Sequence, residues 1–354
     1  MKIIKCFLIT IAAIGSLSAV VMGQNAKAEF NRGLEQHKNK DFAACVGSFT
    51  RSIEYDDNQY AAHYNLGLCK LGLKQYAEAN SAFRRSLQMQ PDFVDAMIQL
   101  GNSLDLSGDY KGALVSYENA KRLEPNNEKI YFEMGVAHEG QKKYDLAEAA
   151  YRKAIDLQPD SVVTLMTLGT LLDRQKKYAD AYIFYSRAAV LDPANVKANN
   201  RIGDYHLRVA NFPAAITAFN KTLSVNPKDV DGLLGMGDAY FNDKKYAESI
   251  PFFTKAAQLS PAWALPHEYL GDAHFNVKQY AIAKAAYEKA LAINAKSPTS
   301  LYQLSRIAII NSDKPAAVNF YQRLLNVDPE SAKKLPPMIN QKFPGAIPPP
   351  DMEN

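Results

Sequence analysis

The fold is decided by the stretch EKIYFEMGVAHEGQKKYDLAEAAYRKAIDLQPDS, which runs from Glu128 to Ser161. Bulky and small residues recur at helical spacing in its first half, at Tyr131, Met134, Gly135 and His138. The same spacing marks the second half, at Ala147, Tyr151, Ala154 and Ile155, and Pro159 ends it. The stretch therefore predicts two helices joined by a short turn, with Gly135 and Ala147 leaving room where the helices cross.

This pattern recurs along the chain every 34 residues, as from Gly33 to Gly67. Glycines keep the spacing at Gly33, Gly67, Gly101, Gly135, Gly169, Gly203, Gly237 and Gly271. An aromatic column keeps it at Phe49, Phe83, Tyr117, Tyr151, Tyr185, Phe219, Phe253, Tyr287 and Tyr321. A single hairpin cannot bury such a face by itself, so we expect successive hairpins to stack on one another.

The period and the order of the columns resemble those of the tetratricopeptide repeat family. The unit Val230–Trp263 is most similar to the family pattern, with Met236, Gly237, Tyr240, Phe253, Ala256 and Pro261. The resemblance implies an all-α fold, a right-handed superhelical α-solenoid of tandem helix-turn-helix repeats. It covers nine units, over residues 26–59, 60–93, 94–127, 128–161, 162–195, 196–229, 230–263, 264–297 and 298–331. The first and the last two units depart from the pattern, as terminal repeats of solenoids do.

The N-terminus has the pattern of an export signal. Lys2 and Lys5 precede a mostly apolar stretch, and small residues follow as far as Gly23. We expect residues 1–23 to form a cleaved signal peptide, and the alternative is an uncleaved membrane anchor over residues 3–22. The protein is accordingly expected to be exported, either periplasmic or secreted.

The C-terminal residues 332–354 form a proline-rich tail in which no full helix is expected. Apolar residues nevertheless recur there, at Leu335, Met338, Ile339, Phe343 and Ile347. They indicate that the first part of the tail covers the last repeat as a cap. A disordered tail is the alternative.

No catalytic site, cofactor or metal site is predicted. The repeats occupy residues 26–331, and glycines that lie a full repeat apart cannot form a phosphate-binding loop. Histidines occupy bulky or aromatic positions of the repeats, which indicates a packing role, at His63, His138, His206, His267 and His274. The net charge of +4 is too small to indicate nucleic-acid binding.

Two cysteines, Cys45 and Cys69, lie on neighbouring predicted helices that should touch. A disulfide between them is possible in an oxidising compartment. Free cysteine is also a common buried core residue, and two free thiols are the favoured interpretation.

In the resembled family the first helix of each repeat lines a concave groove in which ligands dock. The residues predicted to face this groove include an acidic stripe with aromatic neighbours, at Asp204, Asp238, Asp272, Asp231, Glu268, Asn200, Asn242, Asn276, Phe241 and Phe275. Other groove positions are Asn102, Tyr64, Phe132 and Tyr302, with Arg174 and Arg208 as a basic spot. Helices about 8–10 Å apart hold the aspartates too far from one another to chelate one metal ion. The stripe favours a basic, extended peptide instead.

We therefore expect a non-catalytic scaffold of the cell envelope or exterior that binds a protein or peptide in its groove. It would contact a membrane only through its N-terminal segment, if that segment is not cleaved. The alternative is a carbohydrate-binding module, in which Tyr64, Phe132, Phe241, Phe275 and Tyr302 would stack on cell-wall glycans.

Overall fold

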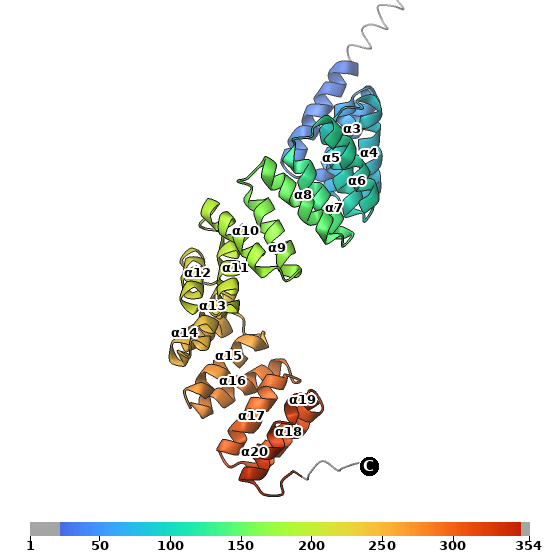
Figure 1. Ribbon diagram of the computed structural model, residues 1–354. Coiled ribbons are helices and arrows are strands. Elements are labelled where there is room, and N and C mark those ends of the chain that lie inside the picture. The colour runs from blue at the N-terminus through green and yellow to red at the C-terminus, as the bar shows by residue number, and fades with distance from the viewer. Residues whose placement is uncertain (1–21, 348–354) are drawn as a thin grey trace, which may run out of the picture. The chain divides into compact units, whose positions relative to one another are not determined.

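The computed structural model describes residues 22–347, and these residues form helices joined by short turns, with no strand among them (Figure 1). Residues 22–38 are helical, and α2 (Phe42–Tyr55) completes the first hairpin. The later hairpins begin with α3 (Tyr60–Gly72), α5 (Val94–Leu106), α7 (Glu128–Gly140), α9 (Val162–Arg174), α11 (Val196–Arg208), α13 (Val230–Asn242), α15 (Ala264–Asn276) and α17 (Pro298–Ile310). Their second helices are α4 (Tyr76–Met89), α6 (Tyr110–Leu123), α8 (Tyr144–Leu157), α10 (Tyr178–Leu191), α12 (Phe212–Val225), α14 (Tyr246–Leu259), α16 (Tyr280–Ile293) and α18 (Lys314–Leu325). The all-α prediction is confirmed, and the first helices of the hairpins start at the interval of the glycine column, as at Tyr60 and Val94.

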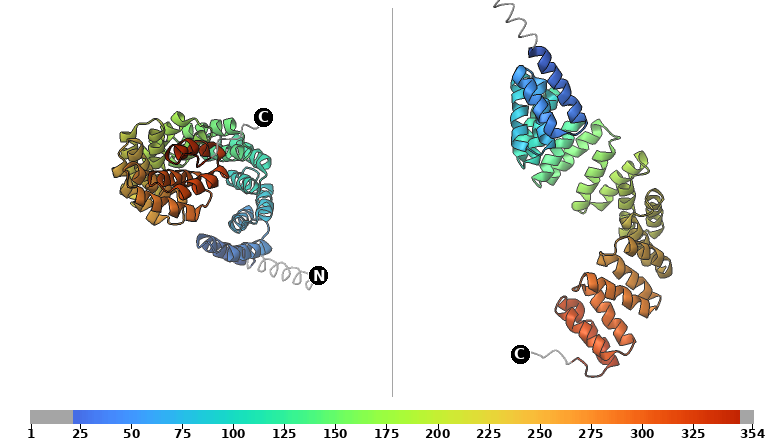
Figure 2. Two further views of the ribbon diagram at one scale, coloured as in Figure 1. Left: turned by 90° about the horizontal axis from the view of Figure 1, so that it is seen from below. Right: turned by 180° about the vertical axis from the view of Figure 1, so that it is seen from behind.

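The chain divides into two compact units, Met1–Leu172 and Asp173–Asn354, which are called unit 1 and unit 2 below. Within each unit, the second helix of one hairpin packs against the first helix of the next, as α6 does against α7 and α12 against α13. The views in Figure 2 show the same order of paired helices from two further directions.

Close packing between a glycine and an aromatic ring joins the two helices of a hairpin. A Cβ atom added at Gly135 of α7 would lie 2.5 Å from Cε1 of Tyr151 in α8. The Tyr151 side chain is fully buried, so its ring has no room to move aside. The glycine column and the aromatic column of the sequence are therefore the two sides of one repeated contact.

A disulfide joins Cys45 in α2 to Cys69 in α3, with 6.0 Å between the two Cα atoms. Both residues are fully buried in a small core with Phe49 and Ala62. The favoured interpretation of two free thiols was therefore wrong. The two positions were expected to touch, but contact alone does not reveal the oxidation state of two sulfur atoms.

The C-terminal residues pack onto the last hairpin. Short helices α19 (Pro329–Ala332) and α20 (Leu335–Lys342) follow α18, and α20 contacts both α17 and α18. Leu335 and Ile339 are fully buried there, and Ile347 is 8% exposed. The cap is thus present as far as residue 347, and the expectation that no full helix fits the tail was wrong. Prolines in the first turn are compatible with a helix because the first N–H groups of a helix have no partner within it.

No helix within residues 22–347 is long and apolar enough to cross a membrane. The predicted signal peptide or anchor falls almost entirely on residues 1–21, which lie outside the described part of the chain.

Candidate functional site

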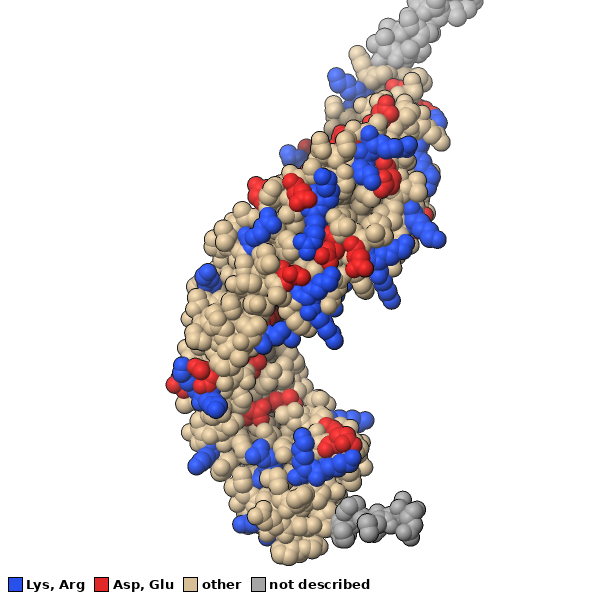
Figure 3. Space-filling view, viewed as in Figure 1, with Lys and Arg blue, Asp and Glu red and all other residues tan. Residues whose placement is uncertain are grey.

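Three aspartates form the centre of the candidate site in unit 2. Asp204 in α11, Asp238 in α13 and Asp272 in α15 each follow the glycine that packs against the aromatic ring of its hairpin. They therefore occupy equivalent positions on three successive first helices, and are called the acidic row below. Figure 3 shows acidic atoms in a recess of this part of the molecule.

The carboxylates of the acidic row influence one another. Burial, and to a smaller extent the charges of Asp204 and Asp272 on either side, raise the pKa of Asp238 to about 6. Burial also raises the pKa of the Asp204 and Asp272 carboxyls above the usual range. About half of the Asp204 side chain is exposed (48%), yet protein atoms surround it closely enough to weaken its hydration. The row is an environment in which additional positive charge would be stabilised.

In two repeats, a tyrosine hydroxyl from the aromatic column donates a hydrogen bond to the residue that directly follows the column glycine. The Tyr287 hydroxyl donates to Oδ1 of Asp272 at 2.5 Å, and Gln303 donates to the same oxygen at 2.9 Å. In unit 1 the Tyr117 hydroxyl donates to Oδ1 of Asn102 at 2.7 Å. Asn102 and Asp272 are therefore part of the internal hydrogen bonding of their hairpins.

Asp204 and Asp238 lack this donor because the corresponding aromatic residues are Phe219 and Phe253. Asp204 forms an ion pair with Arg201 at 3.3 Å. The partly buried carboxylate of Asp238 has no hydrogen bond or ion pair within the described residues. Among the three members of the row, Asp238 is thus the one whose acceptor capacity the fold leaves unused.

The other polar residues predicted near the row differ in how the fold uses them. Asn200 donates to Asp229 at 2.8 Å and accepts from Thr222 at 2.7 Å, so its amide is occupied. Glu268 accepts hydrogen bonds from Ser297 and Ser300. Asp231 is exposed, and the exposed Asn242 and Asn276 donate to backbone carbonyls one turn earlier in their own helices.

The predicted aromatic residues of unit 2 are partly buried and already have neighbours. Phe241 packs edge-on against Tyr246 and Phe253, with ring centroids 5.1 and 6.5 Å apart. The guanidinium of Arg306 lies over the rings of Phe275 and Tyr302, at 4.5 and 5.7 Å. Arg306 thus covers ring faces of Phe275 and Tyr302 that stacking on a sugar would require.

The two predicted basic residues lie at the ends of two different helices. Arg208, at the end of α11, stacks over the ring of Tyr178 at 3.7 Å, and Arg174 is an exposed residue at the end of α9.

The predicted residues of unit 1 lie apart from the acidic row in sequence and belong to another compact unit. Tyr64 packs on Phe83 and Phe93, and burial raises its pKa to about 12. Phe132 packs on Tyr151 with ring centroids 5.6 Å apart.

Unit 1 also contains a pair of acids that sequence reasoning missed, Asp105 and Glu133. Burial raises the pKa of both carboxyls. Burial also raises the pKa of the nearby Tyr117 hydroxyl, and the charges of Glu133 and Asp105 add to that shift. The available signal was their position, four residues after one glycine of the column and two residues before the next.

Within the described residues, no group of three or more histidine, cysteine, aspartate or glutamate side chains could hold a metal ion. The histidines pack as side chains of the repeats, and two of them have polar side-chain partners nearby in the sequence. Nε2 of His63 lies 3.0 Å from Oδ1 of Asp57, and Nδ1 of His274 lies 2.6 Å from Oε1 of Gln279.

Sequence comparison matches tetratricopeptide repeat models to residues 60–93, 128–161, 200–262 and 270–332, and a TPR repeat model to residues 101–142. Together these matches include more than half of the chain. No curated protein matches it.

Solved structures share the fold at low sequence identity. The C-terminal part of a TPR repeat-containing protein from Cytophaga hutchinsonii is 22% identical, with a TM-score of 0.57, over 67% of this chain and 98% of that one. A tetratricopeptide repeat protein from Parabacteroides merdae is 21% identical, with a TM-score of 0.51, over 70% and 98% of the two chains. With its repeated hairpins, the matched repeats and these structural relatives, the chain belongs to the tetratricopeptide repeat family.

Proposed function

We propose that this scaffold binds an extended, basic segment of a protein partner along the acidic row of unit 2, with Asp238 as the central anchor. Protein–protein interaction is the general role that membership of the family supports. The basic character of the partner, the site and the absence of catalysis are our proposal.

The observation that carries the proposal is the Asp238 carboxylate, which is partly buried between two other carboxylates and has no donor among the described residues. A lysine or arginine side chain from a partner would supply the missing donors and relieve the repulsion within the row. Charge-assisted hydrogen bonds in a partly desolvated site contribute more than those on an open surface. Exposed Asp231 and Asn242 add further polar contacts on the same helix.

We further propose that the protein acts outside the cytoplasm, as a periplasmic or secreted protein, or as one anchored by residues 3–22. The charged, then apolar, then small pattern of the N-terminus supports export. The Cys45–Cys69 disulfide supports it independently, because such bonds persist mainly in oxidising compartments.

The test compares Asp238→Asn with Asp180→Asn in fluorescence anisotropy titrations of a labelled Lys/Arg-rich peptide. Asp180 is an exposed acid in the first turn of α10, so both variants lose the same charge. We expect Asp238→Asn to weaken binding about tenfold, which corresponds to about 1.4 kcal/mol, and Asp180→Asn to have less than about a twofold effect.

Equal affinities of the wild type and Asp238→Asn would refute the assignment of the anchor. Retention of a neutral glycan, without binding of the basic peptide, would support the carbohydrate alternative instead.

A further inference from the structure

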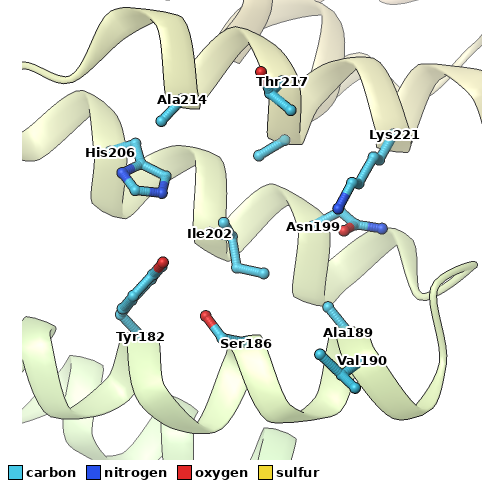
Figure 4. Close-up of a pocket in the computed structure, with 11 residues that line it drawn as sticks. Tyr182, Ser186, Ala189, Val190, Asn199, Ile202, His206, Ala214, Thr217 and Lys221 are labelled. Carbon is cyan, nitrogen blue, oxygen red and sulfur yellow. The ribbon is translucent and has the colours of Figure 1, made fainter.

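A cavity of 380 Å³ lies in unit 2 between α10, α11 and α12. Ile202 of α11 lies at its centre (Figure 4). Asp204 follows Ile202 by two residues, which is a rotation of about 200° around a helix. The cavity and the acidic row therefore lie on opposite sides of α11.

One wall residue of the cavity is smaller, and one floor residue is more polar, than the residues at the equivalent positions of several other repeats. Ala189 in its wall corresponds to Ile53, Leu87, Ile155, Leu223 and Leu291, each a whole number of repeats away. Asn199 in its floor corresponds to Leu165 and Leu233. Ala257 stands at the position equivalent to Ala189 two repeats later, so the small residue is shared with one other repeat, whereas Asn199 has no second asparagine at its position.

One end of the cavity carries polar atoms that the fold does not use. The hydroxyl of Ser186 and Nδ1 of His206 are shielded from solvent and have no hydrogen-bond partner within the described residues. Figure 4 shows the side chains of Tyr182, Ser186 and His206 directed into the same space. Burial lowers the pKa of His206, which keeps its imidazole neutral at neutral pH. Buried polar atoms of this kind require a partner.

The other end carries a positive charge. Lys221 of α12 is exposed and extends toward Asn199 (Figure 4). No acidic side chain lines the cavity. Val190, which is 79% exposed, adds apolar surface at the rim.

We propose that this cavity binds a small aromatic carboxylic acid that carries a hydrogen-bonding group at its far end. The carboxylate lies at Lys221, the ring lies over Ile202, and the polar group reaches Ser186 and His206. The seven steps from Asn199 to His206 rise about 10 Å along α11, a length that one benzene ring with substituents at opposite ends largely fills. The volume of the cavity falls within the usual range of small-molecule sites, and apolar walls with a few polar groups are the usual lining of such sites.

The test is titration of the full chain with 4-hydroxyphenylacetate, followed by NMR shifts of the Ile202 and Val190 methyl groups. We expect saturable shifts, with weaker binding of phenylacetate, which lacks the hydroxyl, and of 4-hydroxyphenylacetamide, which lacks the charge. Ala189→Leu restores the bulk found in other repeats and should weaken binding at least about tenfold, whereas Ala189→Ser should retain it.

Lys221→Met should weaken binding of the acid about threefold to fivefold without changing binding of the amide. Lys255→Met is the matched control, because Lys255 is the exposed lysine at the equivalent position one repeat later. Absence of saturable shifts at about 10 mM probe, or unchanged binding in Ala189→Leu, would overturn the proposal. Binding of the basic peptide to these variants reports on the acidic row separately, so the two proposals can fail independently.

Discussion

Substitution of Phe253 by tyrosine should give Asp238 the donor that it lacks. The Phe253 ring lies against Gly237 as the Tyr287 ring lies against Gly271, and a hydroxyl at Tyr287 reaches Asp272 at 2.5 Å. Asp238 and Phe253 are separated by the same 15 residues as Asp272 and Tyr287. The new hydroxyl should therefore point at the Asp238 carboxylate.

The size of the effect follows from the pKa of Asp238, which is about 6 in the folded protein against an ordinary value of 3.8. Because the folded state binds this proton more tightly, its contribution to stability is complete below about pH 4 and is lost as the pH rises through about 6. Each unit of pKa corresponds to about 1.4 kcal/mol, so the wild type should lose about 2 kcal/mol across this window after an allowance for solvent screening. A hydrogen bond to the carboxylate should lower the pKa by about one unit and recover about 1 kcal/mol at neutral pH.

The assay is urea denaturation of both proteins at about pH 4.5 and pH 7.5, with an NMR titration of the Asp238 carboxyl. Phe83→Tyr is the matched control, because Leu68 follows the glycine of that repeat and offers no acceptor. We expect Phe253→Tyr to be stabilised at the higher pH only, and Phe83→Tyr at neither pH. An unchanged Asp238 pKa in Phe253→Tyr would refute the reasoning.

Three further predictions concern the packing of the repeats. Gly135→Ala should destabilise the protein by about 2 kcal/mol, because the new methyl group would lie 2.5 Å from Tyr151. Gly47→Ala should not destabilise it, because the nearest neighbour of that methyl group is Arg51 at 3.5 Å. Equal urea midpoints for the two variants would contradict the packing argument. Reduction of the Cys45–Cys69 disulfide should lower the free energy of unfolding by about 3 kcal/mol and increase hydrogen exchange in α2 and α3. Alkylation of both cysteines in unreduced, unfolded protein would show that the bond is absent. Ile339→Ala should lower the free energy of unfolding by about 3 kcal/mol and expose the backbone amides of α17 to hydrogen exchange. Lys342→Ala, on the exposed side of α20, should do neither. Unchanged exchange protection of α17 in Ile339→Ala would exclude a capping role.

The repeated hairpin could be predicted from the sequence because each column has one packing role. Gly135 and Tyr151, which stood out by spacing alone, prove to be the two sides of one contact. Individual bonds were harder to predict, because the columns do not say whether two cysteines are oxidised. Nor did the proline content of the tail reveal α20, since its prolines occupy a first turn that tolerates them.

The candidate site was predictable in position but not in detail. The acidic row could be read from three aspartates that each follow a glycine. The difference among them depends on whether the aromatic residue 15 positions later carries a hydroxyl, as with Tyr287 but not Phe253. That pairing was visible in the sequence, but its meaning depends on a hydrogen bond that only the structure shows.

Site-specific photo-crosslinking in cells tests the central claim most directly. A photoreactive residue at the exposed Asn242, one turn after Asp238 on α13, should capture a partner through a segment rich in lysine or arginine. The same residue at the exposed Lys255 on α14 should not capture it, and Asp238→Asn should strongly reduce the adduct at position 242. Equal capture from both positions, or an adduct at position 242 whose yield is unchanged in Asp238→Asn, would contradict the account.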